Sequence, residues 1–76
     1  MASVQKVKLT IQNSSNVEEI EYDYETNHMW VTYKGGRKYV YHGVPADIFH
    51  QIPTVESVGK FLNENVKTKY HYAQVS

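Results

Sequence analysis

A tryptophan and three basic residues lie close together in the middle of the chain and could bind a ligand that carries both rings and phosphates. They are Trp30, Lys34, Arg37 and Lys38. An indole ring stacks on bases, and lysine and arginine neutralise phosphates, so this combination is typical of proteins that bind single-stranded nucleic acid. The alternative is that Trp30 covers a neighbouring strand or a dimer interface, and both interpretations stay open at this point.

The residues that usually carry catalysis or bind metals form no comparable group. The four histidines show no zinc-ligand spacing, and the chain has no cysteine. The glycines match neither common phosphate-binding loop, and no serine lies in a nucleophile elbow. We therefore expect a protein that is not an enzyme, with no catalytic residue, no metal site and no cofactor. The histidines concerned are His28, His42, His50 and His71.

Length and charge set the broad limits. A chain of 76 residues predicts one domain, spanning residues 1–76, whose thin core needs most of its large apolar side chains. The net charge of zero argues against the broad basic surface of duplex-binding domains, and five of the eight acidic residues lie in residues 18–25. The sequence shows neither a signal peptide nor a membrane-spanning segment, so we expect a soluble, cytoplasmic protein with no membrane partner.

Alternating apolar and polar residues predict four strands in the first part of the chain. The segments are KVKLTIQ (6–12), VEEIEYDY (17–24), HMWVTY (28–33) and RKYVY (37–41). Asparagine and serine residues at 13–16 predict a turn between the first two strands, and Glu25, Thr26 and Asn27 predict the next turn. Such closely spaced strands predict an antiparallel meander.

The register of the hairpin around Gly35 and Gly36 decides where the tyrosines point. A two-residue turn would place Tyr39 and Tyr41 on the face of Trp30. A loop of residues 34–36, with Gly36 in the left-handed conformation, places Tyr39 opposite Val31 and Tyr41 opposite Met29. We favour the second register because the first puts Lys38 among apolar residues. It leaves His28, Trp30, Thr32, Lys38 and Val40 on the outer face.

The apolar period then changes to that of helices. Pro45 is suited to the first turn of a short helix that ends at Pro53, and Thr54 is expected to cap a second helix reaching about Thr68. Gly59 within the second helix suggests close packing against a neighbour. The predicted fold is therefore α+β: a small four-stranded antiparallel meander followed by two helices packed on one face.

Two further groups of residues complete the assignment. We expect Tyr39, Tyr41, Val44, Pro45, Phe61 and Tyr70 to belong to the structural core. A second basic and aromatic cluster lies near the C-terminus, where the alternative is that Tyr70 packs under the sheet edge and the last residues fray. Its members are Lys67, Lys69, Tyr70, His71 and Tyr72.

The order of several short motifs resembles the KTSC domain, a module similar to the C-terminal extension of some lysyl-tRNA synthetases that also occurs alone in bacterial and phage proteins. The resemblance covers residues 14–70. The matching positions are Ser14 and Ser15, then Tyr39, Tyr41, Val44 and Pro45, then Ser57, Gly59, Phe61 and Asn63, and finally Tyr70. Leu62 stands where the family usually has a second aromatic residue.

The resemblance implies a small binding module, with RNA suggested as its ligand. On this chain the RNA surface would be Trp30, Lys34, Arg37 and Lys38. The alternative, suited to a stand-alone phage protein acting in the host cytoplasm, is a module that binds a host protein, forms a homo-oligomer or sequesters a small nucleotide.

Overall fold

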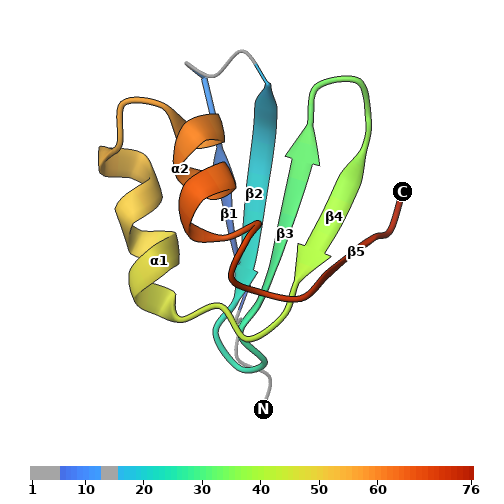
Figure 1. The fold of residues 1–76 in the computed structure, drawn as a ribbon, viewed down its shortest axis with the longest axis vertical. Coiled ribbons are helices and arrows are strands. Elements are labelled where there is room, and N and C mark those ends of the chain that lie inside the picture. Colours follow the sequence, from blue (N-terminus) through green and yellow to red (C-terminus); the bar gives the residue numbers. More distant parts are fainter. Residues whose placement is uncertain (1–5, 13–15) are drawn as a thin grey trace.

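The computed structural model describes residues 6–12 and 16–76, and within them the chain forms one antiparallel sheet with helices on one face (Figure 1). The predicted α+β class is confirmed, but the sheet has five strands rather than four, in the order β1-β2-β3-β4-β5. The elements are β1 Lys6–Thr10, β2 Val17–Asp23, β3 His28–Tyr33, β4 Lys38–Tyr41, α1 Ala46–Gln51, the 3-10 turn η1 Ile52–Thr54, α2 Val58–Asn65 and β5 Tyr72–Gln74.

The β3–β4 hairpin has the register that the apolar pattern favours. Met29 pairs with Tyr41 and Val31 pairs with Tyr39. The backbone N–H of Tyr33 donates to the carbonyl of Arg37 at 2.8 Å, which leaves residues 34–36 as the loop. Gly35 and Gly36 both have positive φ angles, +101° and +97°, so the loop needs glycine at two positions rather than one.

The helices begin and end at other residues than the sequence suggests. Pro53 does not end the first helical segment, because the chain continues through it as η1. The second helix starts at Val58 and is capped by Ser57, whose Oγ accepts the N–H of Lys60 at 3.3 Å. Thr54 is not the cap, since its hydroxyl donates to the carbonyl of Gln51. The helix ends at Asn65, short of the predicted Thr68.

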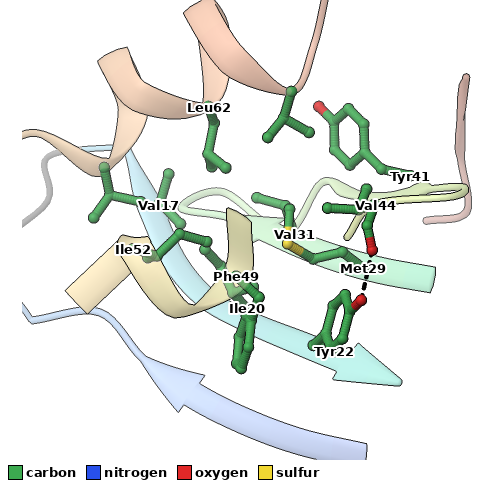
Figure 2. Close-up of a cluster of buried hydrophobic side chains, with 12 residues drawn as sticks. Val17, Ile20, Tyr22, Met29, Val31, Tyr41, Val44, Phe49, Ile52 and Leu62 are labelled. Carbon is green, nitrogen blue, oxygen red and sulfur yellow. Dashed lines mark hydrogen bonds between the residues drawn. The ribbon is translucent and has the colours of Figure 1, made fainter. Parts of the chain in front are cut away.

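The core lies between the helices and the inner face of the sheet. Figure 2 shows Phe49, Ile52 and Leu62 from the helical layer directed toward Val17, Ile20 and Val31 on the strands. In Figure 1 the helices lie in front of the β1–β2 side of the sheet, and the β3–β4 hairpin and β5 extend beyond them to the right. The helical layer therefore covers the inner face unevenly.

A closed set of hydrogen bonds fixes one end of this core. The hydroxyl of the fully buried Tyr22 donates to the carbonyl of Val44, the dashed line in Figure 2. The Asn27 amide donates to the same hydroxyl at 2.7 Å, and the N–H of Val44 donates to the Asn27 carbonyl at 3.0 Å. Asn27 has a φ of +61°, a conformation that asparagine tolerates better than most residues.

The expected core residues divide into three groups. Tyr41 and Val44 are buried, at 1% and 0% exposure. Tyr39, Phe61 and Tyr70 are half-buried and pack against the core. Pro45 differs from the expectation: its side chain is exposed, because it stands just before α1 in an extended conformation. Ser14 and Ser15 lie outside the described residues.

Candidate functional site

A groove lies on the inner face of the sheet, beside α2, and we refer to it as the tyrosine groove. Its volume is about 720 Å³. Its walls come from the start of β2, the β3–β4 hairpin, α2 and β5. The lining residues are Asn16, Tyr33, Lys34, Arg37, Tyr39, Tyr41, Gly59, Lys60, Asn63, Lys67 and Tyr72. The groove thus joins segments that are far apart in the sequence.

Tyrosine rings from three strands form one side of the groove. Tyr33 and Tyr39 meet edge to face, with ring centroids 5.7 Å apart. Tyr72 on β5 contacts Tyr39 at 5.9 Å and Tyr41 at 5.4 Å. In an edge-to-face contact the positive edge of one ring meets the negative face of the other, an arrangement that aromatic quadrupoles favour. Tyr72 is 47% exposed, so this aromatic surface is open to a ligand.

Tyr41 links the groove to the core. Its side chain is almost fully buried although it contributes to the groove lining. Burial, followed by the interaction with Tyr33, raises the pKa of the Tyr41 hydroxyl above its ordinary value. Burial therefore keeps the Tyr41 hydroxyl protonated to a higher pH than an exposed tyrosine.

Basic side chains surround the aromatic surface. Lys34 comes from the hairpin loop and Arg37 directly follows it, whereas Lys60 and Lys67 come from α2 and the turn after it. Within the described part of the chain, the lining of the groove includes no aspartate or glutamate. An anion would therefore meet positive charge from two sides of the groove.

The helical wall contributes two residues without charge. Gly59 and Asn63 are four residues apart on α2, so they lie one above the other on the same helix face. The expectation that Gly59 packs closely is only weakly met, because a Cβ at this position would lie 3.7 Å from the Asn16 amide, an ordinary contact distance. The wall is therefore smooth at Gly59 and polar at Asn63.

The structure separates the four residues that the sequence suggests as a binding surface. Lys34 and Arg37 line the tyrosine groove, whereas Trp30 and Lys38 lie on the outer face of the sheet. Lys6 covers one face of the Trp30 ring, with its Nζ 4.7 Å from the ring centroid. Val40, which pairs with Trp30 on the outer face, is only 7% exposed.

Acidic residues also lie on that outer face. Glu21 is directly opposite Trp30, and Glu19 and Asp23 occupy the neighbouring pairs of the same strand. Backbone N–H groups, first that of Glu25, bind the Asp23 carboxylate and lower its pKa. The Asp23 carboxylate therefore keeps its negative charge to a more acidic pH than an ordinary aspartate. An anionic ligand on the outer face would have to approach this row of carboxylates.

Several groove residues were missed by the sequence interpretation. In the sequence Lys60 has the position of a solvated helix residue, and only its place beside the hairpin brings it into the groove. Asn63 is one of the positions that carry the KTSC resemblance, but no binding role was predicted for it. Lys67 and Tyr72 belong to the C-terminal cluster noted in the sequence, and this cluster was the available signal. Among the described residues, no group of three potential metal ligands occurs, and none of their helices is long and apolar enough to cross a membrane. The expectations that the protein has no metal site and no membrane partner stay predictions.

Fold and groove together define a small α+β domain with an aromatic and basic inner groove. The family model of the KTSC domain matches residues 13–70, and this chain belongs to the KTSC domain family. A protein from Tsukamurella paurometabola is 33% identical over 57 residues, which is 75% of this chain and 85% of that protein. The crystal structure of a KTSC domain protein from Yersinia pestis has a TM-score of 0.82 and 22% identity, covering 93% of this chain and 99% of that one, and it shows the same fold.

Proposed function

We propose that this KTSC domain is a non-enzymatic module that binds single-stranded RNA in the tyrosine groove. The observation that carries the proposal is the lining itself: four tyrosines and four cations, without an acidic side chain among the described residues of the wall. Proteins that bind single strands combine such positive grooves with rings on which bases stack. The residues that carry the family resemblance point to the same place, since Tyr39, Tyr41, Gly59 and Asn63 all line the groove.

The two faces of the sheet make unequal candidates for RNA. The groove offers open tyrosine rings between Lys34 and Arg37 on one side and Lys60 on the other. On the outer face, Trp30 is covered by Lys6 and flanked by Glu21. Because every nucleotide carries a negative phosphate, the groove is favoured electrostatically over the outer face.

The test is RNA affinity measured as a function of salt concentration. We expect Lys34→Ala and Arg37→Ala each to weaken the binding of a short unstructured RNA and to reduce the slope of log affinity against log salt by about one half to one. Lys38→Ala is the matched control, because it removes the same charge from the opposite face. If Lys38→Ala and Trp30→Ala weaken binding and the groove variants do not, the outer face is the RNA surface and this proposal is wrong.

The size of the groove favours a second candidate, which is the sequestration of a free small nucleotide. A volume of about 720 Å³ lies within the range of small-molecule sites, roughly 300 to 1,000 Å³. Calorimetry with free nucleotides and with oligonucleotides separates the two functions: sequestration predicts that a mononucleotide or dinucleotide binds as tightly as a longer RNA. In either case we expect the ligand to be recovered chemically unchanged, which mass spectrometry of the released ligand checks.

A further inference from the structure

We infer that the tyrosine groove holds the base of one unpaired nucleotide between the tyrosine rings and the wall of α2, with Asn63 bonding the base edge and Gly59 leaving room for the ring. This inference rests on the proposed RNA-binding function and adds to it the part of the nucleotide that the groove recognises. The ligand class is therefore a single strand with accessible bases, rather than any chain of phosphates.

Gly59 is the first observation behind this inference, because the fold itself does not explain a glycine there. Glycine inside a helix is less stable than alanine. The φ of Gly59 is not in the left-handed region, and among the described residues the only atom within 4 Å of an added Cβ is the Asn16 amide nitrogen, at 3.7 Å. Backbone conformation and packing would both accept alanine. The missing side chain instead widens the groove, at the point where α2 lines it.

Asn63 is the second observation. It lies one helical turn beyond Gly59 in the groove lining, and its side chain makes no hydrogen bond to another described residue. A carboxamide presents a donor and an acceptor side by side, as does the edge of every unpaired base. In contrast, the Asn65 amide is already bonded to the carbonyl of Phe61 at 3.2 Å. Asn63 is thus the neutral polar group of the helical wall that remains available to a base.

The tyrosine rings provide the third observation. Tyr39 meets both Tyr33 and Tyr72 edge to face, and Tyr72 keeps about half of its surface open. A base that enters beside them can therefore stack or pack on a ring without displacing a core residue. The cations of the hairpin and of the α2 side line the same groove, so they can contact the phosphates on either side of that base. A paired base could not enter in this way, because its edge is already hydrogen-bonded to its partner.

The test compares two ligands of equal charge and length by fluorescence anisotropy at one salt concentration: an oligouridylate of eight nucleotides and the corresponding abasic ribose-phosphate chain. We expect the base-bearing strand to bind about tenfold more tightly or better, the range that stacking on aromatic side chains provides. Equal affinities would overturn the inference while leaving phosphate binding in place. Absence of binding by both ligands would instead refute the proposed function and the inference with it.

Two variants locate the effect on α2. Gly59→Ala and Asn63→Ala should each lower the affinity for oligouridylate about five- to tenfold and leave the affinity for the abasic chain unchanged. Gln51→Ala, which removes an exposed amide on α1 outside the groove lining, should change neither affinity. Urea melts establish that each variant is folded. Unchanged oligouridylate binding by both folded variants would show that this wall does not contact the base, and it would overturn the inference.

Discussion

Two groups of tyrosines lie on the same inner face of this sheet and differ in almost every other respect. Near α1, Tyr22 is fully buried, stacks on Phe49 with ring centroids 5.0 Å apart, and meets Tyr24 edge to face at 4.9 Å. Beside α2, Tyr33, Tyr39 and Tyr72 surround a groove and keep part of their rings open. The residue type and the sheet face are the same, so these do not decide the role of a tyrosine.

The difference comes from what the helical layer covers. Phe49 of α1 closes the first group, and the Tyr22 hydroxyl is satisfied by Val44 and Asn27 inside the protein. Beside the second group, the wall of α2 presents Gly59, Lys60 and Asn63, which leave the rings uncovered. Aromatic residues under a large apolar side chain act in folding, and those beside small and basic residues are available to a ligand. Stability and binding experiments should therefore separate the two groups.

The largest expected effect is that of Tyr22→Ala. Removing this buried ring also removes its stack on Phe49, so we expect the free energy of unfolding to fall by about 3 to 5 kcal/mol. Tyr39→Ala removes a half-buried ring and should cost less, about 1 to 2 kcal/mol. Urea denaturation followed by circular dichroism measures both. Equal losses for the two variants would contradict the division into a closed and an open group.

A smaller effect should come from the hydroxyl groups alone. Tyr22→Phe leaves the carbonyl of Val44 and the amide of Asn27 without their buried partner, and we expect it to lower the free energy of unfolding by about 1 to 3 kcal/mol. Tyr39→Phe removes the hydroxyl of a half-buried side chain that lines the open groove, and it should change stability by less than about 0.5 kcal/mol. The same melts test this pair. A Tyr22→Phe protein as stable as the parent would show that the bonds among these three residues contribute little.

Tyr41 lines the groove and is also buried in the core, and the pH dependence of the free energy of unfolding tests this burial. Its pKa is raised in the folded protein, so the unfolded chain loses this proton first, near pH 10, while the folded chain keeps it. Stability from this residue is therefore fully present below pH 10 and is lost as the pH rises above it. Between pH 9 and pH 11 we expect a loss of about 1 kcal/mol.

Tyr41→Phe is the control for the pH experiment, because lysine side chains also titrate in this range. Urea melts of both proteins at several pH values give the difference that belongs to Tyr41. The parent should lose stability more steeply than Tyr41→Phe above pH 10. Parallel curves would mean that the Tyr41 hydroxyl is as well solvated in the fold as in the unfolded chain.

Most of the sheet could be predicted from the sequence, because apolar alternation and hairpin turns depend on residues that are close together in the chain. The hairpin register followed from one comparison, since the competing register would bury Lys38, and the observed pairing of Val31 with Tyr39 agrees. The predicted boundaries of the second helix were wrong, because both Thr54 and Ser57 are residue types that can cap a helix and only the fold selects Ser57. Strand β5 is three exposed residues without apolar alternation, and it exists because the edge of β4 offers hydrogen-bonding partners.

The groove could not be predicted because no short segment contains it. Lys34 and Arg37 were recognised as basic residues near an aromatic one, but the aromatic residue chosen was Trp30, which lies on the opposite face. Two aromatic residues that share the groove with Lys34 and Arg37, Tyr39 and Tyr72, come together only when β5 joins β4. The sequence therefore predicted which kinds of side chain could bind a ligand, and the topology determines which of them share a site.

One small expected effect on stability has the opposite sign and tests the difference between the two groups most directly. Gly59→Ala should raise the free energy of unfolding by about 0.5 to 1 kcal/mol, because alanine is the better helix former and its Cβ has room beside Asn16. A thermal melt shows this as a modest increase in the midpoint. Lower stability would mean that the glycine serves packing. Higher stability combined with weaker RNA binding would show that the open group retains a less stable helix because the groove needs the space.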